Sequence, residues 1–169
     1  MTATQTLVGL ADIKVHQGPA LFTCLGLGSC IGFAAFDPKT EVAGMIHIML
    51  PEMFPGKPLE KPGKFADTGI PALLESMEGM GAERSRLVVA YAGGAQVFKF
   101  GASAENRMDV GTRNGAAVEE LVKKLRLRVL AHDIGGNAGR TVSVCTRTGE
   151  MRVRTVSAGE KLLCNLRGR

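Results

Sequence analysis

Residues 26–51 read GLGSC-IGFAAF-DPKT-EVAGMIHIMLP, and this stretch decides the fold. A largely apolar run lies on each side of Asp37-Pro38-Lys39-Thr40, and Asp-Pro often begins a turn. The two runs therefore predict a β-hairpin. If the turn is centred between Pro38 and Lys39, the numbers of paired residues sum to 77. Cys30 and His47 then become direct cross-strand neighbours, with Cβ atoms about 4.5–5.5 Å apart.

The alternation of side chains along the hairpin assigns its two faces. The most apolar face, expected in the core, carries Ile31, Phe33, Ala35, Val42, Gly44, Ile46 and Ile48. The other face carries Cys30, Gly32, Met45 and His47. A slip of one residue in the pairing would break up the apolar set. The sequence thus predicts a thiol and an imidazole on one face, away from the most hydrophobic positions.

A thiol beside an imidazole is the arrangement that nucleophilic catalysis needs. The ordinary thiol pKa is near 8.5, and an adjacent imidazolium is expected to lower it. Gly26 and Gly28 let the chain turn sharply before Cys30. We expect the backbone N–H of Cys30 and a neighbouring N–H, at Gly28 or Ser29, to face the oxyanion of a tetrahedral intermediate. Packing without catalysis is the alternative interpretation of the same cysteine–histidine pair.

The remaining chain predicts an α+β domain. Helical periodicity marks residues 66–80, with Asp67 as the expected cap, and residues 112–125. A Pro/Gly/Lys-rich stretch over 51–64 predicts an exposed loop. Strands are expected at about 12–16, 20–25, 31–36, 42–49, 86–91, 127–132, 140–146 and 151–156. Many strands and two helices favour helices packed on one side of a large or doubled sheet.

Length and composition exclude several classes of protein. The chain has 169 residues, of which 45% are hydrophobic and 22% charged, so one domain over residues 1–169 is the expectation and disorder is excluded. Four cysteines without a C-x-x-C pair and three histidines provide no zinc spacing. We expect a cytoplasmic protein, because no export signal or membrane-spanning segment is evident. Aromatic residues are too scarce for a platform that stacks nucleic-acid bases.

The net charge of +5 is concentrated at the C-terminal end of the chain. Residues 140–169 contain seven basic and two acidic residues, which gives 7 − 2 = +5. A solvated face is one interpretation, and a docking surface for an acidic partner is the other.

Several ordered motifs resemble the chemoreceptor glutamine deamidases, the CheD family of chemotaxis proteins. They are LGLGSC at 25–30, MIHIMLP at 45–51, KPGKFAD at 61–67, GGA at 93–95, GTRN at 111–114 and DIGGN at 133–137. The resemblance covers about residues 8–157. The last dozen residues add nothing to it and could form a tail.

The resemblance implies a cysteine hydrolase that converts receptor glutamines to glutamates without a metal or organic cofactor. Cys30 matches the family nucleophile and His47 its catalytic histidine. The family's third catalytic residue is a threonine at the position of Cys24. Thr23 lies next to that position, but in a strand it would point to the opposite face. Either Cys24 orients His47, a bulge brings Thr23 round, or the third group is dispensable.

The resemblance also implies a fold and partners. The expected fold has three layers, with paired β-sheets flanked by helices, and is similar to the catalytic domain of Rho-deamidating toxins. The expected partners are the cytoplasmic helices of chemoreceptors and the CheC phosphatase, with no nucleic acid and no membrane insertion. Two alternatives stay open: a non-catalytic adaptor that binds receptors or the phosphatase, and a thiol hydrolase acting on small amides or esters.

Overall fold

The computed structural model describes residues 3–58, 61–96 and 109–168. They form two five-stranded sheets and two α-helices, which is an α+β fold. The first sheet has the order β1-β3-β8-β9-β10, with bounds Thr4–Leu7, Ala20–Leu27, Arg140–Cys145, Glu150–Thr155 and Gly159–Asn165. The second has the order β2-β5-β4-β6-β7, with bounds Ile13–Gln17, Val42–Ile48, Ile31–Asp37, Val88–Gly93 and Arg128–Ile134.

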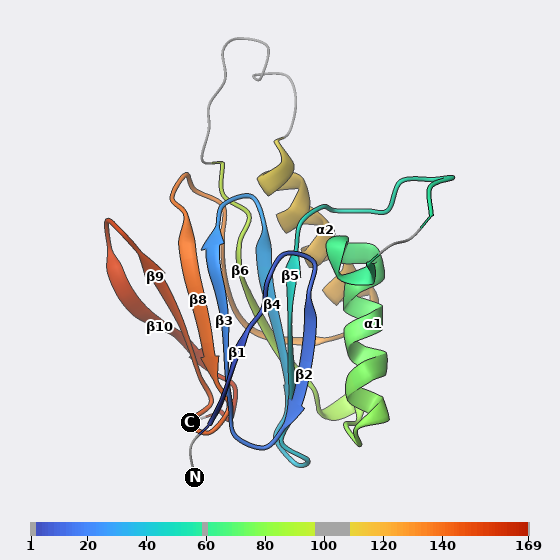
Figure 1. Cartoon of the computed structure of the whole chain (residues 1–169), viewed down its shortest axis with the longest axis vertical. Helices are drawn as coiled ribbons and strands as arrows, with labels where there is room; N and C mark the ends of the chain where they lie inside the picture. The colour runs from blue at the N-terminus through green and yellow to red at the C-terminus, as the bar shows by residue number, and fades with distance from the viewer. Residues whose placement is uncertain (1–2, 59–60, 97–108, 169) are drawn as a thin grey trace.

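The molecule has three layers, which Figure 1 shows from the side: the first sheet, the second sheet and the helices. Helices α1 (Ala66–Gly79) and α2 (Val110–Lys124) lie together against the second sheet, and two single-turn 3₁₀ helices, Pro62–Lys64 and Arg84–Arg86, precede α1 and β6. Both sheets are mixed, because β1 pairs with β3 and β6 pairs with β7 in parallel while the other pairs are antiparallel. Both helices therefore cover one side of a doubled sheet, as the sequence predicts.

The predicted hairpin forms the centre of the second sheet. All seven residues of β4 and all seven of β5 are buried. Phe33 and Ile46 pack toward the helices, whereas Phe36 and Met45 pack into the core between the two sheets. The predicted division of faces is confirmed. The face that carries His47 is also buried, because the first sheet covers it.

The predicted register of the hairpin is wrong by two residues. Asp37 pairs with Val42 and Gly32 with His47, so paired numbers sum to 79 and four residues form the loop. The backbone N–H of Lys39 donates to the carboxylate of Asp37 at 3.0 Å, and Glu41 adopts a left-handed φ of 60°. This side-chain cap lengthens the turn. Because the shift is an even number, Cys30 and His47 keep the same face but are no longer directly opposite.

Other sequence predictions need smaller corrections. The segment left as a tail includes β10, which pairs with β9 at the edge of the first sheet. Helix α1 begins at Ala66, and Asp67 does not cap it, because its carboxylate accepts a hydrogen bond from the backbone N–H of Met53 at 3.0 Å. Helix α2 begins at Val110, two residues earlier than expected, with Asp109 as its cap.

The buried carboxylate of Asp37 joins the hairpin turn to the start of β6. It accepts hydrogen bonds from the Arg86 guanidinium, with the shortest at 2.8 Å, and from the backbone N–H of Glu83 at 3.0 Å. Burial by itself would raise the pKa of Asp37. The hydrogen bonds from Arg86, Glu83 and Lys39 outweigh burial and hold that pKa well below its usual value of 3.8.

We predict that Asp37→Asn lowers the free energy of unfolding by about 2 kcal/mol at pH 7, since it removes one partner of a buried ion pair. Because the folded pKa lies below 3.8, the contribution is complete above that value, declines as the pH falls below it, and is fully lost once the pH has fallen through the folded pKa. Urea unfolding of both proteins from pH 7 to pH 3 measures the difference. A difference that stays constant over this range would contradict the account.

Candidate active site

Cys30 lies where the chain crosses from the first sheet to the second. β3 ends at Leu27, and β4 begins at Ile31. The pairing of β3 with β8 shifts register between Cys24 and Leu27, and Gly26 within this bulge has a left-handed φ of 59°. The bulge ends the pairing and redirects the chain toward the second sheet. Cys30 therefore occupies a crossing loop rather than a strand.

Hydrogen bonds from the end of β6 fix this crossing loop. The N–H of Gly94 donates to the carbonyl of Cys30 at 2.9 Å, and the N–H of Ala95 donates to the carbonyl of Gly28 at 2.9 Å. Gly93 has a φ of 125°, and a Cβ at this position would collide with the Cys30 carbonyl oxygen. Glycine at position 93 is thus required for the close approach of β6 to the loop.

A cleft of about 600 Å³ opens beside Cys30, and the first residues of α2 form part of its wall. The predicted residues Gly28 and Ser29 line this cleft together with Cys30. Asp109 caps α2 by accepting a hydrogen bond from the N–H of Thr112 at 2.7 Å. The N-terminus of a helix favours negative charge, and the Asp109 carboxylate offsets part of that effect here.

His47 is buried between the two sheets, with 4% of its surface exposed, and lies opposite Gly32. Its Nδ1 is 3.0 Å from the carbonyl oxygen of Val8. A carbonyl can only accept a hydrogen bond, so Nδ1 carries the proton and donates. In the neutral tautomer that makes this hydrogen bond, Nε2 is the nitrogen without a proton, and no described residue forms a hydrogen bond with it. His47 is therefore held through Nδ1, and its Nε2 has no hydrogen-bond partner among the described residues.

Backbone hydrogen bonds hold Val8 and His47 in this relation. The N–H of Val8 donates to the carbonyl of Thr23 at 2.8 Å, which extends the pairing of β1 with β3. The N–H of His47 donates to the carbonyl of Asp12 at 3.2 Å, and the N–H of Ala11 donates to the carbonyl of His47 at 3.0 Å. The segment between β1 and β2 thus wraps over the histidine and positions its ring.

Cys30 and His47 both lie on the side of the second sheet that faces the first. Cys30 packs against the core between the two sheets. It precedes Gly32, the strand partner of His47, by two residues. His47 also lines a hollow of about 290 Å³, and Gly26 borders both this hollow and the cleft beside Cys30.

The thiol pKa changes in the direction opposite to the sequence prediction. Burial raises the pKa of Cys30 above its usual value of 9.0. The prediction considered only the effect of an adjacent imidazolium, whereas Cys30 packs against the core between the two sheets, where burial disfavours a thiolate. At rest Cys30 is therefore a neutral thiol rather than a preformed thiolate.

Cys24 and Thr23 point to opposite sides of the first sheet. Cys24 is fully buried, and its Sγ is 3.3 Å from the position that a Cβ on Gly32 would occupy. Burial, and then the nearby Cys30 thiol, raise the pKa of Cys24 to about 12. Thr23 is half-buried, between two buried neighbours of the strand, and its backbone carbonyl is the atom that reaches Val8. The bulge begins after Cys24, so it does not bring the Thr23 side chain round.

Two groups near the site are not predicted from the sequence as parts of it. The Val8 carbonyl orients His47, and a backbone acceptor leaves no signature in the residue type. The side chain of Asn114, on α2, donates to the carbonyls of Ser29 and Met49 at 2.8 and 3.0 Å. From the sequence, Asn114 is expected to open the second helix, either as a structural cap or as a wall of the substrate cleft; its bridging contacts are not predicted, although a polar residue in the apolar stripe of a helix is a usable signal.

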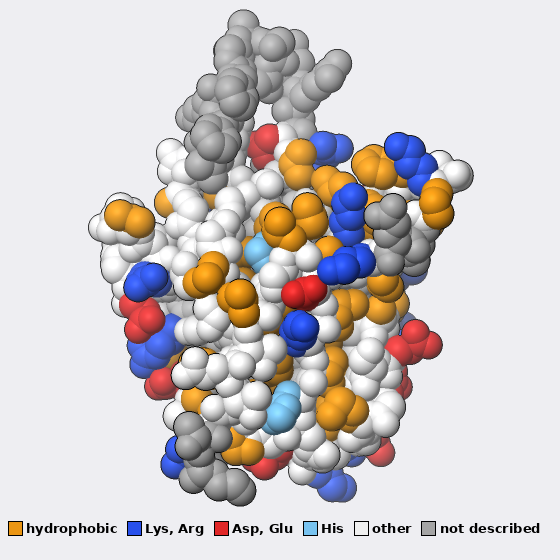
Figure 2. Space-filling view, viewed as in Figure 1, with side chains coloured by type: hydrophobic (Ala, Val, Ile, Leu, Met, Phe, Trp, Pro, Cys, Tyr) orange, Lys and Arg blue, Asp and Glu red, His pale blue; other side chains and the backbone are white. Residues whose placement is uncertain are grey.

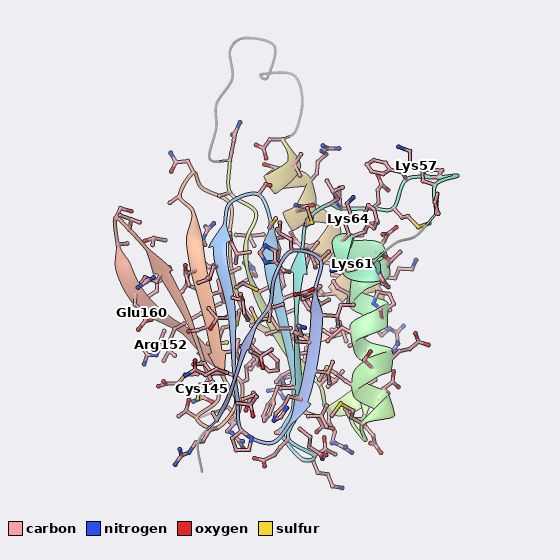
Figure 3. The ribbon with its side chains drawn as sticks, viewed as in Figure 1. Lys57, Lys61, Lys64, Cys145, Arg152 and Glu160 are labelled. Carbon is pink, nitrogen blue, oxygen red and sulfur yellow. The ribbon has the colours of Figure 1, made fainter. Side chains whose placement is uncertain are left out.

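The surface beside His47 is apolar and borders a basic loop. Leu7, Leu10 and Leu25 rim the hollow that His47 lines, and each is more than half exposed. Figure 2 shows hydrophobic side chains on this face of the molecule, around the ends of β1 and β3. In Figure 3, Lys57, Lys61 and Lys64 lie along the connection between β5 and α1. Lys61 forms an ion pair with Asp12 at 3.3 Å.

We predict that alkylation of Cys30 by iodoacetamide accelerates with pH and reaches half its maximal rate above pH 9.0, because burial raises the thiol pKa. Cys24, with a pKa of about 12, should stay unlabelled over the same range. Burial raises the pKa of the Cys145 thiol, but hydrogen bonds from Thr148 and Arg147 outweigh burial and lower that pKa. Cys145 is therefore expected to react as well, so peptide-resolved mass spectrometry is needed to assign the label to Cys30. A midpoint for Cys30 below pH 7 would contradict the neutral resting thiol.

Comparison with known proteins identifies the family. Among the described residues, no helix is long and apolar enough to cross a membrane. Residues 49–155 match the family model described as CheD chemotactic sensory transduction. Proteins named "Probable chemoreceptor glutamine deamidase CheD" are similar to this chain. One from Clostridium botulinum (strain Hall) is 43% identical over 161 residues, covering 95% of this chain and 99% of the relative. One from Desulforamulus reducens is 40% identical over 156 residues, covering 92% and 93%. The resemblance in the motifs is confirmed: this chain belongs to the CheD family.

Proposed function

We propose that this protein is a cysteine hydrolase that deamidates glutamine side chains of chemoreceptors to glutamate. The supporting names belong to its relatives, which are called probable chemoreceptor glutamine deamidases. The observation that carries the proposal is His47, a buried imidazole whose Nδ1 is engaged by Val8 and whose Nε2 is an uncommitted base on the same face as Cys30. The segment matched by the family model begins at residue 49, so both residues precede it.

In the proposed first step, the Cys30 Sγ attacks the carbonyl carbon of the glutamine side chain while His47 Nε2 accepts the thiol proton. The electron pair of the C=O bond moves to oxygen, which gives a tetrahedral oxyanion. A neutral resting thiol suits this order of events, because the base removes the proton as the sulfur–carbon bond forms.

The intermediate then collapses to a thioester. The C–N bond breaks, and His47 returns the proton to the departing nitrogen, which leaves as ammonia. In the second half of the reaction, water attacks the thioester carbonyl with His47 as the base, and the C–S bond breaks. Glutamate and the Cys30 thiol are released. In both halves of the reaction His47 Nε2 accepts and returns the proton. No metal or organic cofactor takes part in the scheme.

The Val8 carbonyl fills the role that the family resemblance assigns to a threonine at the position of Cys24. An orienting group in a catalytic triad fixes the tautomer and the direction of the imidazole. The hydrogen bond to Nδ1 performs both tasks without a side chain. We therefore propose that neither the Cys24 thiol nor the Thr23 hydroxyl is required, which selects one of the three alternatives that the sequence leaves open.

A protein substrate suits the surroundings of the site better than a free amide does. The leucines around the His47 hollow and the neighbouring lysines offer an apolar and basic surface to the side of a helix. We accordingly propose the cytoplasmic helices of chemoreceptors as substrate, the CheC phosphatase as a competing partner, and a cytoplasmic location. Similarity of the fold to Rho-deamidating toxins stays a prediction of the resemblance.

A non-catalytic adaptor is the second candidate. The raised pKa of Cys30 and the cysteine at the family's threonine position favour it. An adaptor would bind receptor helices and leave every glutamine unchanged, so measurement of deamidation separates the two candidates.

We predict that the protein adds about one dalton per modified glutamine to a receptor cytoplasmic fragment, and that Cys30→Ala abolishes this change. His47→Ala should slow the reaction by about 10²–10⁴-fold, as expected for loss of the general base. Intact-mass analysis over time measures both rates. Activity of Cys30→Ala close to that of the wild type would exclude this residue as the nucleophile.

Two matched controls test the assignment of the orienting group. Cys24→Ala and Thr23→Val remove the thiol and the hydroxyl while leaving the Val8 carbonyl in place. Both variants should keep activity within about threefold of the wild type, because His47 retains its hydrogen-bonded tautomer. A loss of about 10²-fold in Cys24→Ala, restored by Cys24→Thr, would assign the orienting role to position 24 instead.

A further inference from the structure

Asn114 is a fully buried polar side chain that ties together the two catalytic segments. Its Nδ2 donates to the carbonyl of Ser29 at 2.8 Å and to the carbonyl of Met49 at 3.0 Å. Ser29 immediately precedes Cys30, and Met49 follows His47 by two residues. One amide group on α2 therefore bridges the nucleophile loop and the end of the strand that carries the base.

Stability alone does not account for an amide at this position. The Oδ1 of Asn114 is buried and has no hydrogen-bond partner among the described residues. A buried acceptor without a partner destabilises a folded protein, and native structures rarely keep one without a reason. What the side chain contributes is its two donated hydrogen bonds, and their acceptors lie in the segments that carry Cys30 and His47.

The hydrogen bond to Ser29 fixes the direction of the neighbouring N–H. The peptide unit between Ser29 and Cys30 is planar, and its bond is not cis. In a trans peptide the C=O and N–H groups point in opposite directions. When Asn114 holds the Ser29 carbonyl toward α2, the N–H of Cys30 must face away from it. No described residue accepts a hydrogen bond from this N–H.

We propose that Asn114 is a positioning residue, which aligns the Ser29–Cys30 peptide so that the Cys30 N–H stabilises the oxyanion formed when Cys30 attacks a carbonyl. This inference rests on the proposed function for its role of Cys30 as nucleophile. The oxyanion forms one bond from the carbon that the Cys30 Sγ attacks, so the N–H of the same residue is suitably close. The hydrogen bond to Met49 keeps the strand of His47 in register with this donor.

Two reagents separate this role from a merely structural one. p-Nitrophenyl acetate acylates a thiol through a tetrahedral oxyanion: the sulfur attacks the ester carbonyl, p-nitrophenolate leaves, and an acetyl thioester remains. Iodoacetamide alkylates the same thiol by direct displacement of iodide, and no oxyanion forms. Loss of the positioned N–H should therefore slow acylation but not alkylation.

The test compares Asn114→Ala and Asn114→Leu with the wild-type protein at a temperature where circular dichroism shows all of them folded. Leucine has the same branched arrangement of heavy atoms as asparagine but lacks its hydrogen-bond donors. Val118→Ala is the matched control, because Val118 lies one turn further along α2, is fully buried in the core beneath the helix and bonds to neither carbonyl. Peptide mass spectrometry assigns the modification to Cys30.

Both Asn114 variants should lose about 10²-fold in the acylation rate at Cys30, while their alkylation rate stays within about threefold of the wild type. Val118→Ala should change neither rate beyond threefold. Equal loss of both rates in the Asn114 variants would mean that only access to the thiol has changed and would overturn the inference. Unchanged acylation in those variants would overturn it as well.

The same assay separates failure of this inference from failure of the proposed function. If Cys30 is acylated in the wild type but receptor glutamines stay unchanged, the deamidase proposal fails, and the ratio of acylation to alkylation still decides the role of Asn114. If Cys30 in the wild type is not acylated at all, both the nucleophile and its positioning residue are rejected.

Discussion

The hydrogen bond from Nδ1 of His47 to the Val8 carbonyl determines what the site can do. An imidazole buried between two sheets has to place its proton on one nitrogen, and the carbonyl selects Nδ1. The other nitrogen is left as a base with no partner among the described residues. If this bond were absent, the ring could adopt the other tautomer, and the nitrogen that faces the reaction would carry a proton that blocks its function.

The fold keeps this bond in place because the hairpin of β4 and β5 is buried on both sides. The second sheet is the middle layer of three, so β4 and β5 contact helices on one face and the first sheet on the other. β1 belongs to the first sheet, and its continuation at Val8 reaches His47 across the inter-sheet space. The same burial raises the thiol pKa, so the fold favours a concerted proton transfer over a preformed ion pair. Asn114 then joins the third layer to both catalytic segments.

Period-two patterning was sufficient to predict the strands and faces of the hairpin, because an error of two residues in register preserves every face. The register depended on Asp37, which caps the turn through the Lys39 N–H and is itself held by Glu83 and Arg86 far along the chain, so the Asp-Pro signal alone did not give the length of the loop. β1 and β10 were missed because they are edge strands with mostly exposed side chains and weak alternation. The direction of the Cys30 pKa required knowledge of the covering sheet, and the role of Val8 required its backbone, which no residue type encodes.

The comparisons show the family. The proposed chemistry depends on which nitrogen of the His47 imidazole carries the proton. Nitrogen NMR of the protein labelled at histidine, with His47 assigned by comparison with His47→Ala, reports the protonation of each ring nitrogen directly. The account predicts that the neutral imidazole carries its proton on Nδ1 and leaves Nε2 unprotonated, both in the wild type and in Cys30→Ala, because the Val8 carbonyl selects the tautomer. A proton on Nε2, or an imidazolium that disappears when Cys30 is removed, would contradict the account.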